Sequence, residues 1–469
     1  MKKLKLRGKE IRRIGLHDDE AVSLAVNLAA KHFRHDDKVD VLEILKELIR
    51  QPADFVKNQY FAELAQFLQP KEIIPPKEKR KKHHFIKTDS EYPVFGQENI
   101  DPEAIKQMQA AMSLPIIVKG ALMADAHLGY GLPIGGVVAA YNTVMPYGVG
   151  MDIGCRMCLS VYPESPKIIK GQRDKLQKIL IENTRFGLGE FTDIGDHELM
   201  ERKEFDEIKI LKALQKSFYN QLGTSGHGNH FVDLGYIVVK EFSSELGIQP
   251  GEYFAILSHS GSRNFGAEIA QHYTRIAADK LGFSGEAGKL AWLELNSEEG
   301  QEYWQAMTLA GDYSAANHRI IHRKLAKALG EKPIKIIENH HNFAWKEKLT
   351  ENETLIVHRK GATPAKVGDL GIIPGNMVSP AFIVSGKGSE ASLNSASHGA
   401  GRQLSRTKAK NSFTKSSLKK VLDQEGVELI GGGPEESPLA YKNIFEVMEA
   451  QKDLVNVLAL FYPKIVRME

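Results

Sequence analysis

Cysteine is nearly absent from this chain, whose 469 residues include only Cys155 and Cys158. Two cysteines cannot build a disulfide framework, and such scarcity is typical of a reducing compartment. No apolar run approaches the ~20 residues that cross a bilayer. The lysine-rich start is not followed by the apolar stretch that a signal peptide requires. We therefore expect a cytoplasmic protein that is neither secreted nor held in a membrane.

An excess of one charge is also missing, because 62 Lys and Arg against 59 Asp and Glu leave a formal net charge of +3. Glycine (41) and proline (19) are too few for a collagen-like or mostly disordered chain. The GxxxxGK[S/T] phosphate loop, the GxGxxG fingerprint, the GxSxG elbow and the HExxH pair are all absent. These absences exclude the common signatures of nucleotide-binding, serine-hydrolase and zinc-protease sites.

The chain divides into three regions of different texture. Residues 1–70 carry apolar residues at helical spacing, which predicts a small helical N-terminal extension. Residues 71–90 contain adjacent prolines and the run Lys-Glu-Lys-Arg-Lys-Lys-His-His, which predicts a basic linker. A second basic cluster places seven Lys or Arg between Lys2 and Arg13. Each basic segment is either a solvated tether or a contact for nucleic-acid phosphates.

From residue 91 onward, short strand-like runs alternate with helical stretches. The pattern predicts one large α/β domain, with mixed α+β character, over residues 91–469 and with its chemistry on loops. We expect strands at 114–118, 136–140, 254–258, 354–358 and 381–385. We expect helices at 174–184, 208–221, 267–281, 315–329 and 445–460.

Four glycine-rich segments carry side chains that bind metal ions. In chain order they are Gly-Val-Gly-Met-Asp-Ile-Gly-Cys at 148–155, Gly-Thr-Ser-Gly-His-Gly-Asn-His at 223–230, Leu-Ser-His-Ser-Gly-Ser-Arg at 257–263 and Glu-Asn-His-His-Asn at 338–342. The candidate ligands in them are Asp152, Cys155, His230, His259 and His341. A carboxylate, a thiolate and imidazoles could together hold Zn²⁺, Mn²⁺ or Fe²⁺. A thiolate can also bridge two ions, as phosphoryl transfer often requires.

The second cysteine is expected to have a different role. If residues 156–161 form a strand, positions three apart point to opposite faces, so Cys158 belongs to the core while Cys155 faces a cleft. His318 and His322 stand four residues apart in an expected helix without a carboxylate partner. We interpret these two histidines as structural.

A fifth segment, Ser-Ala-Ser-His-Gly-Ala-Gly-Arg at 395–402, presents His398 among small residues. A bulky phosphate could approach the imidazole ring, which makes His398 a candidate nucleophile as well as a candidate ligand. Arg402 and Arg406 are four residues apart and are expected on one helix face, where they would supply hydrogen-bond donors to phosphate.

Together these segments resemble the RtcB family of GTP-dependent RNA-splicing ligases over about four fifths of the chain, from residue 95 onward. The motifs that carry the resemblance lie at 124–136, 148–155, 226–230, 259–263, 340–342, 358–363, 398–402 and 440–442. The first reads Ala-Asp-Ala-His-Leu-Gly-Tyr-Gly-Leu-Pro-Ile-Gly-Gly, and the sixth reads His-Arg-Lys-Gly-Ala-Thr. Residues 1–90 are not explained by it.

The resemblance implies two Mn²⁺ ions in the active site. Asp152, Cys155 and His230 would hold one ion, and Cys155 would bridge to a second held by His259 and His341. It implies GTP as the second cofactor and an RNA substrate with 3′-phosphate or 2′,3′-cyclic phosphate and 5′-OH ends, in RNA repair or tRNA processing.

In the implied reaction, His398 would attack the α-phosphate of GTP and carry GMP to an RNA 3′-phosphate, which a 5′-OH end then joins. The implied nucleotide contacts are Asn229, Asp233, Asn342, Pro374, Gly375, Asn376, Met377, Ala381, Gly399, Ala400 and Gly401. The implied contacts to RNA or to phosphate are Arg263, Lys360, Arg402 and Arg406. Asp125 would lie behind the site and orient its residues without touching the substrate.

The chain departs from the family pattern in the expected nucleotide pocket. Asn376 and Ala381 stand where serines are expected, and Asp233 is one methylene shorter than the expected glutamate. These departures indicate a divergent paralogue. Two other functions are compatible with the residues: a metal-dependent phosphodiesterase or phosphatase that forms no histidine adduct, and an RNA-binding repair scaffold.

Overall fold

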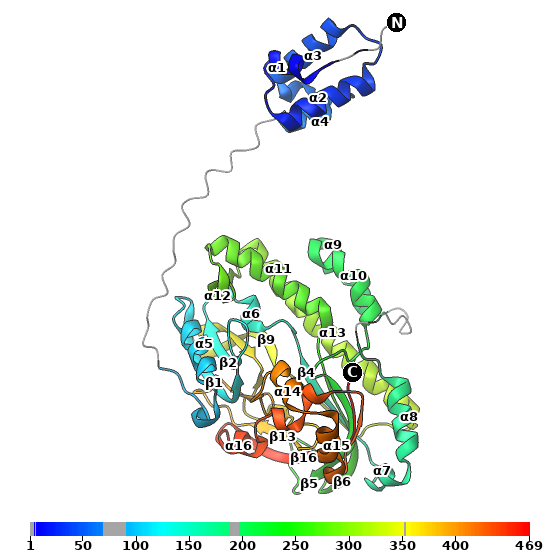
Figure 1. The fold of residues 1–469 in the computed structure, drawn as a ribbon. Coiled ribbons are helices and arrows are strands. Elements are labelled where there is room, and N and C mark those ends of the chain that lie inside the picture. Colours follow the sequence, from blue (N-terminus) through cyan, green and yellow to red (C-terminus); the bar gives the residue numbers. More distant parts are fainter. Residues whose placement is uncertain (1–3, 5, 69–90, 188, 190–196, 351–352) are drawn as a thin grey trace. The chain divides into compact units, whose positions relative to one another are not determined.

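The structure is a computed structural model that describes residues 4, 6–68, 91–187, 189, 197–350 and 353–469. The chain separates into two compact units, Met1–Lys81 and Lys82–Glu469. The linker predicted at 71–90, with its basic run, lies outside the described residues. Figure 1 shows the helices and strands of both units.

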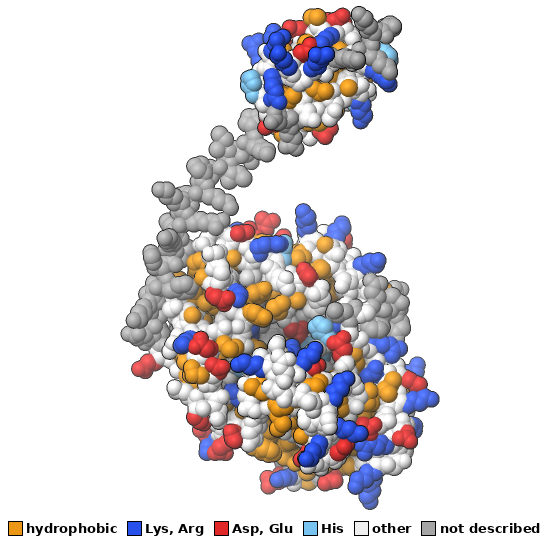
Figure 2. Space-filling model, in the orientation of Figure 1, with side chains coloured by type: hydrophobic (Ala, Val, Ile, Leu, Met, Phe, Trp, Pro, Cys, Tyr) orange, Lys and Arg blue, Asp and Glu red, His pale blue; other side chains and the backbone are white. Residues whose placement is uncertain are grey.

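The first unit is helical in the part that is described. Its elements are α1 (Gly8–Arg13), α2 (Asp19–His32), α3 (Lys38–Arg50), the 3₁₀-helix η1 (Pro52–Phe55) and α4 (Ala62–Leu68). The Asp18 carboxylate caps α2 by accepting from the backbone N–H of Ala21, and Asp37 caps α3 in the same way. Aliphatic side chains and Phe61 form its core. Lys and Arg outnumber acidic side chains on the face seen in Figure 2.

The second unit is built on an eight-stranded sheet. In spatial order its strands are β12 (Leu370–Ile373), β13 (Ala381–Gly386), β16 (Val455–Arg467), β5 (Phe231–Val239), β6 (Gly251–Ser260), β4 (Arg156–Val161) and β8 (Lys335–His340). The eighth strand, β15 (Glu428–Ile430), pairs in parallel with β16, while the other pairings in the described part of this sheet are antiparallel. The predicted α/β class with α+β character is therefore confirmed.

A second, four-stranded antiparallel sheet lies beside the first in the chain's core. Its order is β1 (Ile117–His127), β2 (Ile134–Ala140), β10 (Glu353–Lys360) and β9 (Asn342–Thr350). Two small ladders join β11 (Ala362–Pro364) to β14 (Ser395–Ser397) and β3 (Thr143–Val144) to β7 (Leu293–Glu294). Buried residues of β1, β2 and β10 share one apolar cluster with residues of β13, which holds the two sheets together.

Helices cover these sheets (Figure 1). They are α5 (Pro102–Met112), α6 (Pro146–Val149), α7 (Lys167–Gly171), α8 (Arg173–Asn183), α9 (Glu204–Glu207), α10 (Lys209–Gln221), α11 (Arg263–Leu281), α12 (Gly285–Gly288), α13 (Glu298–Leu329), α14 (Arg406–Ser412), α15 (Lys415–Glu425) and α16 (Ile444–Glu449). Short 3₁₀-helices are η2 (Gln97–Asn99), η3 (Glu198–Glu201), η4 (Pro434–Glu436) and η5 (Pro438–Ala440). Ile321 and Leu325 of α13 pack on Phe254 and Ile256 of β6, so α13 covers one face of the large sheet. Within the described residues, no helix is both long and apolar enough to span a bilayer.

Three expected elements illustrate how the structure differs from the predicted bounds. The helix expected at 445–460 is wrong beyond Glu449, because residues from 455 onward form β16, which is hydrogen-bonded to β13 and β5 on its two sides. Pairing with two neighbours overrides the local helical spacing. The strand expected at 114–118 begins only at Ile117 and extends to His127. The helix expected at 315–329 begins at Glu298, where the Ser297 side chain caps it.

Candidate active site

Most of the candidate residues line one large cavity of the second unit, and His230, Arg263 and Asp125 are not part of its lining. Its volume is about 1170 Å³, and its lining includes Asp152, Cys155, His259, His341 and His398. The visible face of this unit is hollowed near its centre in Figure 2. The structure therefore brings together segments that are up to 246 positions apart in the chain (398 − 152).

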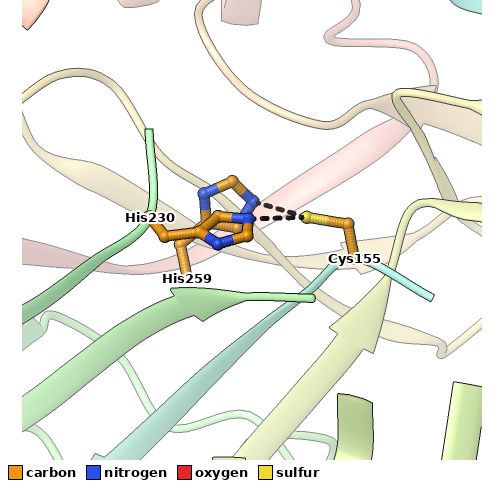
Figure 3. A group of neighbouring side chains, drawn as sticks. All are labelled: Cys155, His230 and His259. Carbon is orange, nitrogen blue, oxygen red and sulfur yellow. Dashed lines mark hydrogen bonds between the residues drawn. The ribbon is translucent and has the colours of Figure 1, made fainter. Parts of the chain in front are cut away.

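The candidate metal ligands lie at the ends of neighbouring strands. Cys155 directly precedes β4, His230 directly precedes β5, and His259 is the penultimate residue of β6. The Cys155 Sγ lies 3.1 Å from His259 Nε2 and 3.6 Å from His230 Nε2 (Figure 3). The two imidazoles thus present the same ring nitrogen to one thiol.

The remaining two candidates complete the group. His341, between β8 and β9, places its Nε2 3.4 Å from that of His259. The Asp152 Oδ2 lies 3.0 Å from His230 Nε2. One carboxylate, one thiol and three imidazoles therefore converge, as the sequence pattern predicts.

Hydrogen bonds behind the ligands orient them. The Nδ1–H of His230 donates to the Ser225 carbonyl at 2.8 Å, and that of His259 donates to the Asn229 carbonyl at 3.0 Å. Each ring consequently turns its Nε2 toward the centre, where a metal ion would bind it. Asp152 Oδ1 accepts from the Ser262 backbone N–H at 2.9 Å. A Cβ at position 261 would lie 2.1 Å from the same carboxylate, which explains Gly261.

The electrostatics suit a divalent cation. Burial lowers the pKa of His259 to about 3, so this imidazole is neutral and able to act as a ligand. Burial alone would raise the pKa of Asp152, but hydrogen bonding and charge from His230 bring that pKa below its ordinary value. Burial and the Asp152 charge raise the pKa of the Cys155 thiol well above its ordinary value. A cation at this point would compensate the carboxylate and stabilise a thiolate, so the donor set fits a transition metal.

Cys158 lies away from this centre. Its thiol is grouped with His318 and His322 of α13, whereas Cys155 is grouped with His230 and His259. The opposite orientation of the two cysteines that strand spacing predicts is therefore confirmed. Sequence reasoning missed that Cys158 and the two α13 histidines lie together, and their spacing in one helix was the only local signal.

His398 follows β14 and is held by a carboxylate on β1. The Asp125 Oδ2 lies 2.6 Å from His398 Nδ1 and also accepts from the backbone N–H groups of His398 and Gly399, at 3.0 and 3.2 Å. The charge and hydrogen bond of His398 lower the pKa of the fully buried Asp125, outweighing the burial that would raise it. Because Nδ1 faces Asp125, the neutral tautomer of His398 carries its lone pair on Nε2, and the His398 ring centroid lies 4.9 Å from that of His341.

The two arginines near His398 are not on one helix face. Helix α14 begins at Arg406, so Arg402 precedes it and this prediction is wrong. Both guanidinium groups instead bind Glu436, Arg402 at 2.9 Å and Arg406 at 2.8 Å. Glu436 is buried, and nothing in the sequence singled it out. Arg406 is half exposed and also donates to Asn229 Oδ1 at 3.0 Å, so it is the arginine better placed to meet a phosphate.

The other two basic candidates are both buried. The Arg263 guanidinium donates to the hydroxyl of Thr224 and the carbonyl of Gly187, so it joins two loops. The Lys360 ammonium lines the cavity and donates to the Tyr130 carbonyl. Burial lowers the pKa of Lys360 to about 7.

The residues expected to contact the nucleotide line the same cavity, namely Asn229, Asp233, Asn342, Pro374, Gly375, Asn376, Met377, Ala381, Gly399, Ala400 and Gly401. Asn342 donates to the Asp152 carbonyl at 3.1 Å and accepts from the Gly361 N–H at 2.7 Å. Asn376 caps its own turn by accepting from Val378 and Ser379. Asp233 is buried, its Oδ1 has no partner among the described residues, and burial raises its pKa well above the ordinary value.

The α+β body holds a cavity in which metal-binding and nucleophilic side chains converge, which is the arrangement of an enzyme active site. The family model described as "tRNA-splicing ligase RtcB" matches residues 107–212 and 190–469. The chain belongs to the RtcB family.

Curated relatives agree with this assignment. The chain is 30% identical over 430 residues to the tRNA-splicing ligase RtcB of Methanococcus maripaludis, covering 76% of this chain and 89% of the relative. It is 30% identical to the RNA-splicing ligase RtcB of Escherichia coli K12, covering 76% of this chain and 92% of the relative. It is also 30% identical to the RNA-splicing ligase RtcB of Mycobacterium bovis, covering 76% of this chain and 98% of the relative.

Proposed function

We propose that this chain is a Mn²⁺- and GTP-dependent RNA ligase that works through a guanylylated histidine. It would join 3′-phosphate or 2′,3′-cyclic phosphate ends to 5′-OH ends, in RNA repair or tRNA splicing. The observation that carries the proposal is the position of His398, which lines the same cavity as the candidate metal ligands Asp152, Cys155, His259 and His341 and is held there by Asp125. Membership of a family of RNA-splicing ligases supports the choice of RNA as substrate. Two free thiols suit a cytoplasmic setting.

The candidate ligands would hold two Mn²⁺ ions, one at Asp152, Cys155 and His230 and one at Cys155, His259 and His341. Bound there, the ions would supply charge compensation for phosphoryl groups. The residues of the chain would do the rest. Arg406 and Lys360 would bind phosphate oxygens, because both border the cavity with N–H groups.

His398 would be the nucleophile. Its Nε2 forms a bond to the α-phosphorus of GTP while the bond from that phosphorus to pyrophosphate breaks, and the ring gains positive charge. The Asp125 carboxylate compensates this charge through the bond from Nδ1–H. GMP then passes to the RNA 3′-phosphate, which restores the neutral imidazole, and the 5′-OH displaces GMP to form the phosphodiester.

Guanine selection would fall to Asp233. Its carboxyl group lines the cavity, and one of its oxygens has no partner within the described part of the chain. A buried polar atom gains free energy from a ligand that completes its hydrogen bonds. The shorter side chain requires the base to sit closer to β5 than a glutamate would.

The test is incubation with GTP labelled at the α-phosphate and Mn²⁺, followed by a denaturing gel. We expect an adduct on the wild-type protein that is labile to acid and stable to alkali, as a P–N bond is. His398→Ala should form no adduct while keeping its metal content. His272→Ala, which changes a histidine on α11 outside the cavity lining, is the matched control and should behave as wild type.

A second substrate isolates the last step. His398→Ala should fail to join 3′-phosphate and 5′-OH ends, yet should join an RNA supplied with a preformed 3′-guanylylated end. A wild-type protein that cleaves phosphodiesters but forms no nucleotide adduct would overturn the proposal in favour of a hydrolase. RNA binding without either activity would instead support a repair scaffold.

A further inference from the structure

Among the buried polar side chains of helix α13 are Asn317, His318 and His322, which bond to segments that carry the candidate metal ligands. Asn317 and His318 are fully buried, and His322 is 4% exposed. Their neighbours Ile321 and Leu325 are apolar and pack on the large sheet. Burying a polar side chain costs free energy unless its groups are hydrogen-bonded, so the partners of these residues indicate their purpose.

Asn317 joins two segments that carry candidate metal ligands. Its Oδ1 accepts from the backbone N–H of Gly223 at 2.7 Å, and its Nδ2 donates to the Gly261 carbonyl at 3.0 Å. Gly223 begins the loop that ends at His230. Gly261 follows β6 two residues after His259. One amide group thus ties the His230 loop to the end of the His259 strand.

The two histidines form a hydrogen-bonded chain with three serines. The Ser260 carbonyl can only accept, so His318 Nε2 must donate to it, at 3.3 Å. His318 Nδ1 then accepts from the Ser258 hydroxyl at 2.6 Å, which leaves Ser258 to accept from His322 Nε2 at 2.8 Å. The chain ends where His322 Nδ1 accepts from the Ser160 hydroxyl at 2.7 Å. One arrangement of protons satisfies every bond, provided both rings are neutral.

Burial keeps both rings neutral, because it lowers the pKa of His322 to about 4 and that of His318 well below the ordinary value. All four ring nitrogens are used by protein partners in this arrangement. Although Cys158 lies close to both rings, neither imidazole therefore has a lone pair to spare for a metal ion. The hydrogen bonds of His318 and His322 are better explained by the strands that they hold in place.

We propose that Asn317, His318 and His322, here called the α13 anchor, are positioning residues for the metal centre. Ser258 and Ser260 flank His259 in β6, and side chains alternate along a strand. Helix α13 holds the Ser258 hydroxyl and the Ser260 backbone carbonyl, so it fixes the strand on both sides of His259, whose side chain points to the opposite face from that of Ser258 and lines the cavity. The anchor also ties β4, through Ser160, to the loop of His230, through Asn317. It acts on the ligands through the strands and touches no reacting atom.

The affinity for Mn²⁺ tests this role, which rests on the proposed function. Removing a group that orients a metal ligand typically weakens metal binding ~10–100-fold. We expect the Mn²⁺ dissociation constant of folded His318→Ala to rise ~10–100-fold above that of the wild type. Calorimetry well below the unfolding temperature of the variant measures it. His318→Gln keeps an N–H near the Nε2 position for Ser260 and should recover part of the affinity.

Ile321→Ala is the matched control, since it truncates a fully buried residue of the same helix that makes only apolar contacts. It should lower thermal stability while leaving the Mn²⁺ dissociation constant within about twofold of wild type. Equal losses of Mn²⁺ affinity in His318→Ala and Ile321→Ala would mean that the anchor acts only through general packing, and they would overturn the proposal. So would an unchanged affinity in His318→Ala.

Two readouts separate this proposal from the proposed function. Histidine ¹⁵N spectra of the metal-free protein, assigned with His318→Gln and His322→Gln, should show both rings protonated at Nε2 only. Cys158→Ala should keep the full metal content, and the loss of one metal equivalent would show that the group is itself a metal site. If the wild type binds no Mn²⁺ through Cys155, the proposed function fails, and a correct tautomer pattern would still establish the network.

Discussion

The carboxylate of Asp125 and the imidazole of His398 meet at 2.6 Å although 273 positions separate them in the chain. The same carboxylate oxygen accepts from two backbone N–H groups, of His398 and of Gly399. Its other oxygen has no partner among the residues that the structure describes. Asp125 therefore fixes the loop, the ring and the tautomer of the candidate nucleophile with one atom.

The variant Asp125→Asn separates the positioning of His398 by hydrogen bonds from the effect of the negative charge of Asp125. The asparagine oxygen can accept the same three hydrogen bonds, so the loop and the tautomer should be retained. The negative charge that compensates the modified ring is lost, and we expect adduct formation to slow by roughly 10²–10³-fold. Single-turnover labelling with GTP measures the rate, and metal content serves as the control. A wild-type rate in Asp125→Asn would show that the charge is dispensable.

Cys155 and Cys158 form a matched pair, because both thiols are almost fully buried. Cys155→Ala should lose bound metal and adduct formation together, since its sulfur faces the Nε2 atoms of both His230 and His259 in the candidate centre. Cys158→Ala should cost about 1 kcal/mol of unfolding free energy and little activity. Metal analysis of the two purified variants checks this, and two tightly bound ions in Cys155→Ala would disprove the assignment of the centre.

Asp233 should make stability depend on pH. Burial raises its folded pKa, so the folded state binds more protons than the unfolded state between the two pKa values. Stability is therefore greatest below the unfolded value and falls as pH rises through that window, by about 1.4 kcal/mol per pH unit inside it. Asp233→Asn should gain on wild type at pH 8, and the gain should shrink toward pH 4. Denaturant midpoints without nucleotide measure this, and a difference independent of pH would contradict it.

The basic N-terminal segments should add RNA affinity that depends on salt and not on sequence. Each phosphate contact steepens the log–log salt dependence by ~0.7 for a single strand. Deleting residues 1–88 should flatten that slope and leave the guanylylation rate unchanged. Filter binding to single-stranded RNA at several salt concentrations provides the slopes. Equal slopes for the two proteins would mean that the segments only tether.

Local pattern was informative where a residue's role follows from its own type and its neighbours. The period of two along a strand separated Cys155 from Cys158, and glycine-rich loops marked His230 and His259 as candidate ligands. Local pattern failed at residues 455–460, because their helical spacing says nothing of the two strands that pair with them.

The amino-acid sequence by itself determined which chemical groups this protein can bring to a reaction, since a thiol, an imidazole or a carboxylate is a property of one residue. Only the tertiary structure decided which groups act together. Sequence pattern predicts Arg402 as a phosphate contact, whereas in the structure it binds Glu436. Sequence pattern gives His318 no partner, whereas in the structure it belongs to the α13 anchor. The physical reason is that hydrogen bonds, burial and shifted pKa values depend on distances of a few ångströms between residues far apart in the chain, which no local periodicity encodes.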